Sequence, residues 1–181
     1  MDSDDDLVLR CRSDPDAFRG LVERYKARLY SFLIRLAGRE AADDLFQEVW
    51  IKVYDAADRY EARGKAASWL FKIANNLAIN HVTRSARAVH VPVEEAAERL
   101  RDPSPQPHAA LERDELRRRL SEGIDGLPRE QRAVFMLREY AGLSFKEIAE
   151  TLEIPLGTAL SRMNYAMDKL RNALGDAAYG S

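Results

Sequence analysis

The chain has 181 residues, of which 46% are hydrophobic and 32% are charged, and its formal net charge is −2. This length suits one domain or two small ones, and the slightly acidic balance argues against a protein that grips nucleic acid by bulk electrostatics alone. No apolar run approaches the roughly 18 residues of a membrane span, so we expect no direct membrane insertion. One cysteine and three scattered histidines offer neither a disulfide nor a metal-ligand spacing, so we expect a reducing cytoplasm and no cofactor.

The chain opens on an acidic segment, residues 1–15, in which four of the first six residues are aspartates. A secretory signal peptide would begin with basic residues, so this segment is not interpreted as one. Chain ends are often poorly ordered, and we expect this acidic tip to be disordered in part. We interpret Cys11 as a small residue on an amphipathic helix rather than as a redox centre.

Residues 16–88 carry the apolar spacing of three amphipathic helices. Gly38 marks the end of the first helix, the second lies near residues 41–57, and the third spans about 68–85 after a loop at 58–67. The residues expected to face the core are Phe18, Leu21, Val22, Tyr25, Leu29, Phe32, Leu33, Leu36, Leu45, Val49, Val53, Leu70, Ile73, Ala74 and Leu77.

Residues 89–110 break this pattern and contain four of the seven prolines. Because proline fixes its own backbone and biases the preceding residue away from helix, this stretch predicts an extended linker. The sequence has no internal repeat and no alternating strand pattern. We therefore expect an all-α protein with two small helical domains, residues 16–88 and 111–181, joined by a proline-rich linker.

Residues 111–181 contain the pattern of a helix-turn-helix. A first helix should end at Gly126, and a second should run from Pro128 to Ala141, with Gly142 as its C-terminal stop. Ser144 and Glu147 have the spacing of a capping box, which predicts the start of a third helix. A fourth helix, about residues 155–174, opens on small polar residues, as helices that read DNA bases do. Its expected buried stripe is Ala159, Met163, Ala166 and Leu170, and those expected on the preceding helices include Leu116, Leu120 and Ile124.

One stretch, residues 62–93, contains no acidic residue. On its predicted helix, an aromatic ring, two amides and a cation share one flank, which could stack on unpaired bases and hydrogen-bond them. A solvated charged face without a ligand is the alternative. The cations of this stretch are Arg63, Lys65, Lys72, Arg84 and Arg87, and the flank consists of Trp69, Lys72, Asn76, Asn80 and Thr83.

Several motifs resemble the extracytoplasmic-function branch of bacterial sigma factors. Asp44-Leu45-Phe46-Gln47-Glu48 is similar to the family's D-L-x-Q-E motif, and residues 68–80 resemble its W-L-x-x-I-A-x-N segment. Residues 127–128, 142–144 and 154–158 resemble its reader of the minus-thirty-five element. The resemblance covers nearly the whole chain. It implies a transcription initiation factor that binds core RNA polymerase, directs it to specific promoters and assists promoter melting.

The resemblance also assigns roles to particular residues. It implies that core polymerase contacts the chain through its β′ clamp helices and β flap, the clamp helices at Asp44, Gln47 and Glu48. It implies that the minus-ten element, read as single-stranded DNA with a base flipped into the loop at 58–67, is bound by Tyr60, Arg63, Lys65, Trp69, Lys72, Asn76 and Asn80. It implies that the minus-thirty-five element is bound by Ser144, Lys146, Thr158, Ser161, Arg162 and Tyr165. Such sigma factors are usually held inactive by an anti-sigma factor, and this partner too is implied.

The last helix departs from the family pattern. Leu160 and Tyr165 stand where the family commonly has basic residues, and Ala159 replaces a valine. Each lost phosphate contact weakens DNA binding and flattens its salt dependence. Either the polar residues of this helix read the element with an unusual sequence preference, or Leu160 joins the core beside the small Ala159. We predict that residues 111–181 alone bind promoter DNA weakly.

Two other functional classes remain open at this point. One is a helix-turn-helix transcriptional regulator that does not depend on polymerase, and the other is a DNA recombinase with a helix-turn-helix tail. The recombinase would need a nucleophile with activating partners in the first domain, and the sequence offers none. No histidine–acid pair serves a serine, and there is no glycine-rich phosphate loop. We therefore expect a protein that is not an enzyme.

Overall fold

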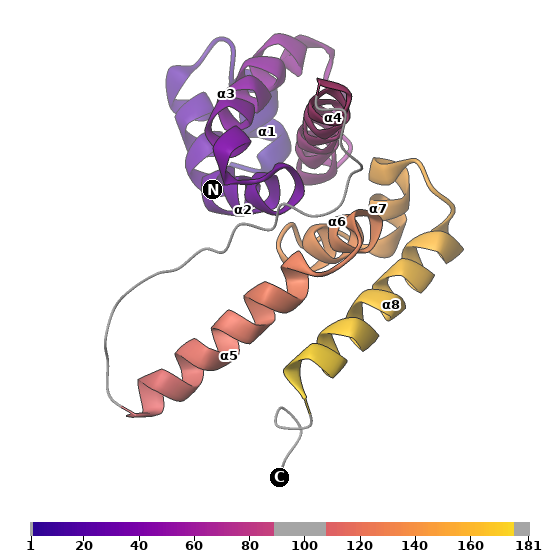
Figure 1. Ribbon diagram of the computed structural model, residues 1–181. Coiled ribbons are helices and arrows are strands. Elements are labelled where there is room, and N and C mark those ends of the chain that lie inside the picture. Colours follow the sequence, from indigo (N-terminus) through magenta and orange to yellow (C-terminus); the bar gives the residue numbers. More distant parts are fainter. Residues whose placement is uncertain (1, 89–107, 176–181) are drawn as a thin grey trace.

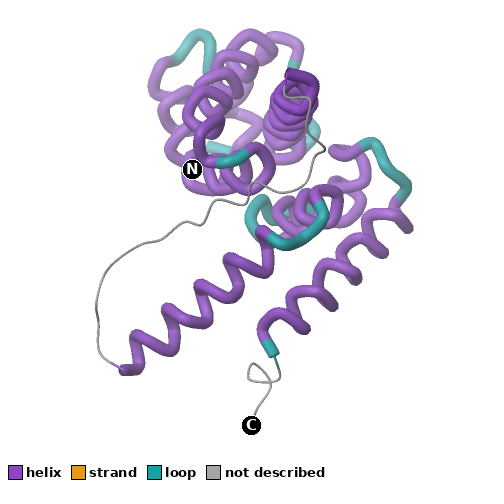
Figure 2. The backbone as a smooth tube through the Cα atoms, viewed as in Figure 1, coloured by secondary structure: helices purple, strands orange, loops and turns teal. Residues whose placement is uncertain are grey.

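The computed structural model describes residues 2–88 and 108–175, and all regular structure in these two stretches is helical (Figure 1, Figure 2). The prediction of an all-α fold is confirmed. No helix in these stretches is long and apolar enough to cross a membrane. The first domain contains α1 (Asp4–Arg10), α2 (Pro15–Ala37), α3 (Arg39–Ala56), the short 3-10 helix η1 (Ala57–Arg59) and α4 (Ala66–Ala88), and the second contains α5 (His108–Asp125), α6 (Arg129–Glu139), α7 (Phe145–Leu152) and α8 (Leu156–Leu174).

The core of the first domain forms where α2, α3 and α4 pack together. Apolar residues recur on α2 at three- and four-residue spacing, which places Tyr25, Leu29 and Phe32 on one buried face. Phe71 of α4 closes this core, with its ring 5.3 Å from that of Phe32 in an edge-to-face contact. The residues predicted to face this core are buried except Phe18, Val22, Ile73 and Leu77, which are half-buried.

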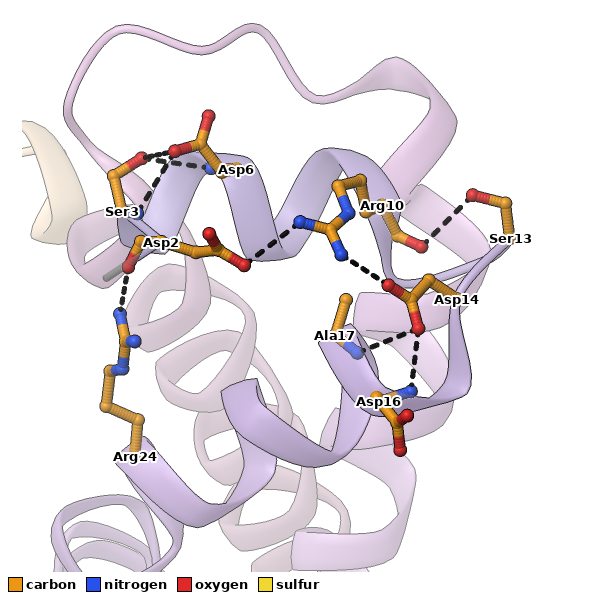
Figure 3. A network of polar contacts seen from close by, with 9 residues as sticks. All are labelled: Asp2, Ser3, Asp6, Arg10, Ser13, Asp14, Asp16, Ala17 and Arg24. Carbon is orange, nitrogen blue, oxygen red and sulfur yellow. Dashed lines mark hydrogen bonds and ion pairs between the residues drawn. The ribbon is translucent and has the colours of Figure 1, made fainter.

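The acidic start of the chain is a helix, so the expectation of disorder in residues 1–15 is wrong for the described part (Figure 3). Ser3 and Asp6 form a capping box, in which the Ser3 hydroxyl accepts from the Asp6 backbone and the Asp6 carboxylate accepts from the Ser3 backbone. Acidic side chains in a first turn are also favoured by the helix dipole. Leu7 and Val8 are buried, and they give this short helix an apolar anchor.

Polar contacts also tie α1 to α2. Arg24 donates to the backbone carbonyl of Asp2 at 3.1 Å, as Figure 3 shows, and it pairs with Asp4. Tyr25 donates its hydroxyl proton to Asp4 Oδ2 at 2.5 Å. Cys11, directly after α1, is 2% exposed, and burial raises the pKa of its thiol. The segment is therefore an integral part of the first domain.

The second domain is built around α6 and the helix-turn-helix α7–α8. The capping box predicted at Ser144 and Glu147 is present, with the Ser144 hydroxyl accepting from the Glu147 backbone at 3.3 Å. The buried stripe predicted on the last helix is confirmed, since its four residues are at most 8% exposed. Ile124 is also buried, but Leu116 is 50% exposed, so the prediction that Leu116 lies on the buried face is wrong.

The two domains meet where α2 packs on α6 and α4 packs on α7. Arg35 of α2 lies 2.5 Å from Asp125 of α5, and it donates to the Ser121 hydroxyl at 2.9 Å. Arg132 of α6 donates to the backbone carbonyl of Arg35 at 2.8 Å and to that of Leu127 at 2.8 Å. The Arg35 side chain is 14% exposed, so this network is mostly shielded from solvent.

The predicted linker boundary moves slightly. Residues 108–110, assigned to the linker, are the first residues of α5 in the structure. The remainder of the predicted linker, residues 89–107, lies outside the described residues, as do residue 1 and residues 176–181.

Candidate polymerase and nucleic-acid interface

The residues predicted to bind polymerase form one exposed face of α3. Asp44, Gln47 and Glu48 are three and four positions apart, so they share one side of the helix, and all three are exposed. Ile51 continues this face by one turn and is 61% exposed. An exposed isoleucine beside acids and an amide suits a protein partner better than a nucleic acid. Sequence reasoning missed Ile51 because helical spacing gives its direction but does not say whether another element covers it.

Tyr60, which opens the loop before α4, is buried. It is 8% exposed, and its hydroxyl donates to Asp5 Oδ1 at 2.6 Å. Burial, together with this hydrogen bond, raises the pKa of Tyr60. Its ring lies 4.9 Å from the ring of the half-buried Trp69. The expectation that Tyr60 itself contacts DNA does not fit this burial, because little of the ring is open to a base.

The two lysines predicted to contact the minus-ten element pair with an acid of α7 and with the acid that directly follows it. Lys65 Nζ lies 2.5 Å from Glu150, and Lys72 Nζ lies 2.8 Å from Glu153. Hydrogen bonds from these ammonium groups hold the pKa values of both glutamates below their usual range. In this arrangement α7 lies beside α4, and both cations are engaged within the chain.

Of the remaining residues of the predicted minus-ten surface, Trp69 is half-buried and the others are exposed. Asn76 and Asn80 lie one turn apart on the flank of α4 that begins at Trp69. Arg63 lies near the tip of the loop and pairs with Glu61 two residues away. The structure thus brings a partly exposed indole and two exposed amides onto one strip.

The residues predicted on the helix-turn-helix differ in how available they are. The Ser144 hydroxyl is committed to its cap and donates to Glu147 Oε2 at 2.6 Å. Lys146, at the start of α7, is exposed. Ser144 therefore caps the start of α7, and the nearby Lys146 is exposed and available to a ligand.

On α8 the predicted readers face outward. Ser161 is exposed and donates to the Thr158 carbonyl at 3.1 Å. Tyr165 is 61% exposed, whereas Thr158 and Arg162 are half-buried. One cation, one hydroxyl and one phenol thus share the solvent side of this helix.

Leu160 does not join the core. It is 41% exposed, and Leu156 one turn earlier is 48% exposed. The neighbouring Ala159 is fully buried. The alternative in which Leu160 offsets the small Ala159 is therefore wrong, because the side chain leaves the helix on the solvent side. The start of α8 instead presents two exposed leucines beside its polar readers.

Two helical domains, a helix-turn-helix and a strip of amides with an indole are the features of a helical DNA-binding protein. In the described residues, no group of three or more His, Cys, Asp or Glu side chains could hold a metal ion. The family profile described as Sigma-70 region 2 matches residues 21–88, and the profile described as Sigma-70, region 4 matches residues 123–172.

Curated relatives agree with these matches over most of their length. The chain is 32% identical to the RNA polymerase sigma-H factor of Pseudomonas aeruginosa, over 96% of this chain and 95% of the relative. It is 32% identical to the ECF RNA polymerase sigma-E factor of Escherichia coli K12, over 89% and 88%. It is 30% identical to the ECF RNA polymerase sigma factor SigW of Bacillus subtilis, over 91% and 92%.

Solved structures share the fold. CnrH in complex with the cytosolic domain of CnrY matches with a TM-score of 0.67 and 24% identity, over 97% of this chain and 99% of that one. The sigma factor RpoE in complex with the anti-sigma factor NepR, from Bartonella quintana, matches with a TM-score of 0.69 and 23% identity, over 87% and 96%. The chain belongs to the extracytoplasmic-function family of RNA polymerase sigma factors. Its function is transcription initiation together with core RNA polymerase and promoter DNA.

Proposed function

We propose that this sigma factor divides its work among three surfaces, of which α3 holds core polymerase and α4 and α8 hold DNA. The observation that carries the proposal is the separation of two exposed faces within the first domain. Asp44, Gln47 and Glu48 share one side of α3, whereas Asn76 and Asn80 lie on α4. A protein and a DNA strand can therefore be bound by the same domain at once.

The α3 face is proposed to dock on the β′ clamp helices of polymerase. Its two carboxylates and one amide offer acceptors for basic and amide side chains, and Ile51 adds apolar area at 61% exposure. Exposed polar groups alone contribute little affinity, while a central apolar residue can be decisive. Ile51 is therefore assigned to the same docking face.

The α4 strip is proposed to bind the minus-ten element as single-stranded DNA. An unpaired base can stack on the open part of the Trp69 ring, and the amides of Asn76 and Asn80 can donate to and accept from base edges. Tyr60 supports this strip from beneath through its ring contact with Trp69 at 4.9 Å. Its role is thus structural support for the base-binding surface.

Binding of DNA to α4 is proposed to replace the contacts that Lys65 and Lys72 make with Glu150 and Glu153. The side chains of these two pairs are 41% to 73% exposed. Exposed ion pairs are weak and screened by salt, so DNA phosphates can compete for the same ammonium groups. The two domains then need to move apart at this contact when the minus-ten strand is bound.

The α8 helix is proposed to read the minus-thirty-five element through Ser161, Arg162 and Tyr165, with Lys146 on a phosphate. With few cations on α8, this contact should depend less on salt than a typical helix-turn-helix contact does. Most of the affinity for the promoter would come from polymerase, which fits the net charge of −2. The β flap is the proposed polymerase partner of this domain.

Two further features belong to the proposal. Because the solved structures of similar fold include a sigma factor bound to an anti-sigma factor, we assign this chain an anti-sigma partner as well. We also assign it to the cytoplasm, where core polymerase works, and give it no enzymatic activity of its own.

Run-off transcription with purified core polymerase tests the proposal. The unaltered chain should start transcripts at defined sites, and sequencing of these starts should reveal the two promoter elements. Glu48→Gln and Ile51→Ala should weaken core binding at least about tenfold, the effect of losing one good interface contact. Glu23→Gln, a change at an exposed acid on α2, serves as the control and should leave binding unchanged. Specific initiation that survives both α3 changes would overturn the assignment of this face.

A further inference from the structure

The carboxylate of Asp5, in the first turn of α1, contacts the loop before α4 at three points. Its Oδ1 accepts from the Tyr60 hydroxyl at 2.6 Å and from the Ala66 backbone at 3.2 Å. Its Oδ2 accepts from the Gly64 backbone at 2.6 Å. A carboxylate has about four lone-pair sites, so one aspartate can satisfy all three donors. Asp5 thereby connects both ends of residues 60–66, although it lies more than fifty residues earlier in the sequence.

Asp5 is held in place independently of the loop. Its neighbour Asp4 accepts from the Tyr25 hydroxyl of α2 at 2.5 Å. Leu7 and Val8, one turn further along α1, are buried at 5% and 0% exposure. Because α1 is anchored by these contacts, the Asp5 carboxylate is a fixed point against which the loop can be ordered.

The loop itself has fixed ends and an open tip. Gly64 has φ of 68°, a conformation that suits glycine, and this turn directs its N–H to Asp5. Tyr60 is buried, and Ala66 is the first residue of α4. Between them, Glu61, Ala62 and Arg63 are exposed. The three bonds to Asp5 therefore order the base of the loop and leave its tip available to a ligand.

We infer that Asp5 is a positioning residue for the minus-ten DNA-binding loop, which it shapes to receive an unpaired base beside Trp69. This inference rests on the proposed role of α4 and its preceding loop in binding single-stranded DNA. It adds the acidic α1 helix, which is itself not proposed to contact DNA, to the parts of the chain that determine which base is accepted. Asp5 influences which base is accepted because it orders the loop, and not because its charge lies near DNA.

The first test measures the loop without DNA. Trypsin can cut after Arg63 and Lys65, and such cleavage requires the loop to open. Asp5→Ala removes all three hydrogen bonds and should speed cleavage at these two sites at least about tenfold, since the loss of one hydrogen bond to a charged group already accounts for that factor. Asp6→Ala is the matched control, because it removes the α1 capping box but none of the loop contacts. Equal cleavage in Asp5→Ala and the unaltered chain would overturn the inference.

The second test measures base recognition by the holoenzyme, formed from core polymerase and the full chain. The probe is a fluorescent single-stranded oligonucleotide that carries the minus-ten element found by transcript sequencing, with an abasic site placed at each position in turn. Asp5→Ala should lose about tenfold in affinity for the intact element and should no longer respond to the abasic site at the flipped base. Its response at the positions read by Asn76 and Asn80 should remain.

The outcomes distinguish the positioning role of Asp5 from the proposed role of α4 in DNA binding. A base preference that survives unchanged in Asp5→Ala overturns the role of Asp5 and leaves the proposed function standing. An equal loss at every position in Asp5→Ala and Asp6→Ala also overturns it, because that pattern reports only a weakened α1. An unaltered holoenzyme that ignores every base overturns the proposed role of α4 and the positioning role with it, while the trypsin result still decides whether Asp5 orders the loop.

Discussion

Replacement of Arg35 by alanine should shift the two helical domains apart. The guanidinium of Arg35 lies 2.5 Å from Asp125, and it donates to the Ser121 hydroxyl at 2.9 Å and to the Ser121 carbonyl at 3.3 Å. Its side chain is 14% exposed, less than any side chain in the two other ion pairs described between the domains. Alanine at this position removes all three contacts and leaves Asp125 without its cation.

The size of the effect follows from the burial of the pair. A hydrogen bond to a charged group contributes about 1.5–3 kcal/mol. Asp125 is 28% exposed, so water can partly replace the lost cation and the lower half of that range applies. We therefore expect a loss of about 2 kcal/mol in the free energy that favours the packed arrangement, a shift of about thirtyfold in the equilibrium between packed and separated domains.

Energy transfer between two dyes measures this equilibrium. The dyes are attached at Lys52→Cys on α3 and Lys169→Cys on α8, both exposed positions. Cys11 is 2% exposed, so the native thiol competes little for dye. Arg35→Ala should shift the packed–separated equilibrium that the transfer efficiency reports about thirtyfold toward the separated state. Arg19→Ala, an exposed arginine paired within α2, should leave the efficiency unchanged.

A conservative change gives a second check. Arg35→Lys keeps the charge but cannot reach Asp125 and Ser121 together with a planar fork, so its transfer efficiency should fall between the two extremes. Unchanged transfer in Arg35→Ala would refute the reasoning, because it would mean that apolar packing between α2 and α6 alone holds the domains together.

Three further predictions concern the separate domains. Ser144→Ala should lower stability by about 1 kcal/mol and the Tm by about 2–4 °C, because the α7 cap is lost; an unchanged melting curve would contradict this. Leu160→Lys should strengthen binding to minus-thirty-five DNA and steepen its salt dependence by about 0.9 in log–log slope, whereas Leu116→Lys on α5 should not; equal slopes would refute a phosphate contact from this position. Burial works to raise the pKa of Asp4, but hydrogen bonds from Tyr25 and a neighbouring arginine outweigh it and lower the pKa. Its stabilising effect is therefore complete above about pH 4 and is lost as the pH falls further, so the urea midpoint of Asp4→Asn should depend less on pH below 4, and parallel curves would rule this out.

Features that depend on local spacing were predictable from the sequence. The Ser144 cap requires only a glutamate three residues later, and the buried stripe of α8 requires only the helical period. The exposure of Asn76 and Asn80 follows from the same period once the apolar face of α4 is known. These predictions held because nothing distant in the chain decides them.

Features that depend on distant contacts were not predictable. The side chain of Tyr60 is of a kind that often contacts DNA. In the structure, however, its hydroxyl donates to Asp5, which lies far earlier in the chain. From the sequence, Lys65 is an unpaired cation, because its partner Glu150 is 85 residues away in the chain. In the structure the two side chains lie next to each other. The run of charges at the start of the chain predicts a disordered tail. The burial of Leu7, which is 5% exposed, could not be predicted because it depends on contacts with the rest of the first domain.

Because Cys11 is buried, the rate at which its thiol is labelled reports how often the surrounding part of the first domain opens. Alkylation requires the thiolate, and burial both blocks access and raises the pKa of this thiol. The observed labelling rate should therefore equal the rate of an open thiol multiplied by the fraction of time that this corner of the first domain is undocked. A single cysteine gives one signal without any engineered site. A partner that stabilises or displaces α1 would change the labelling rate of Cys11. Binding of such a partner could therefore be titrated by following this rate.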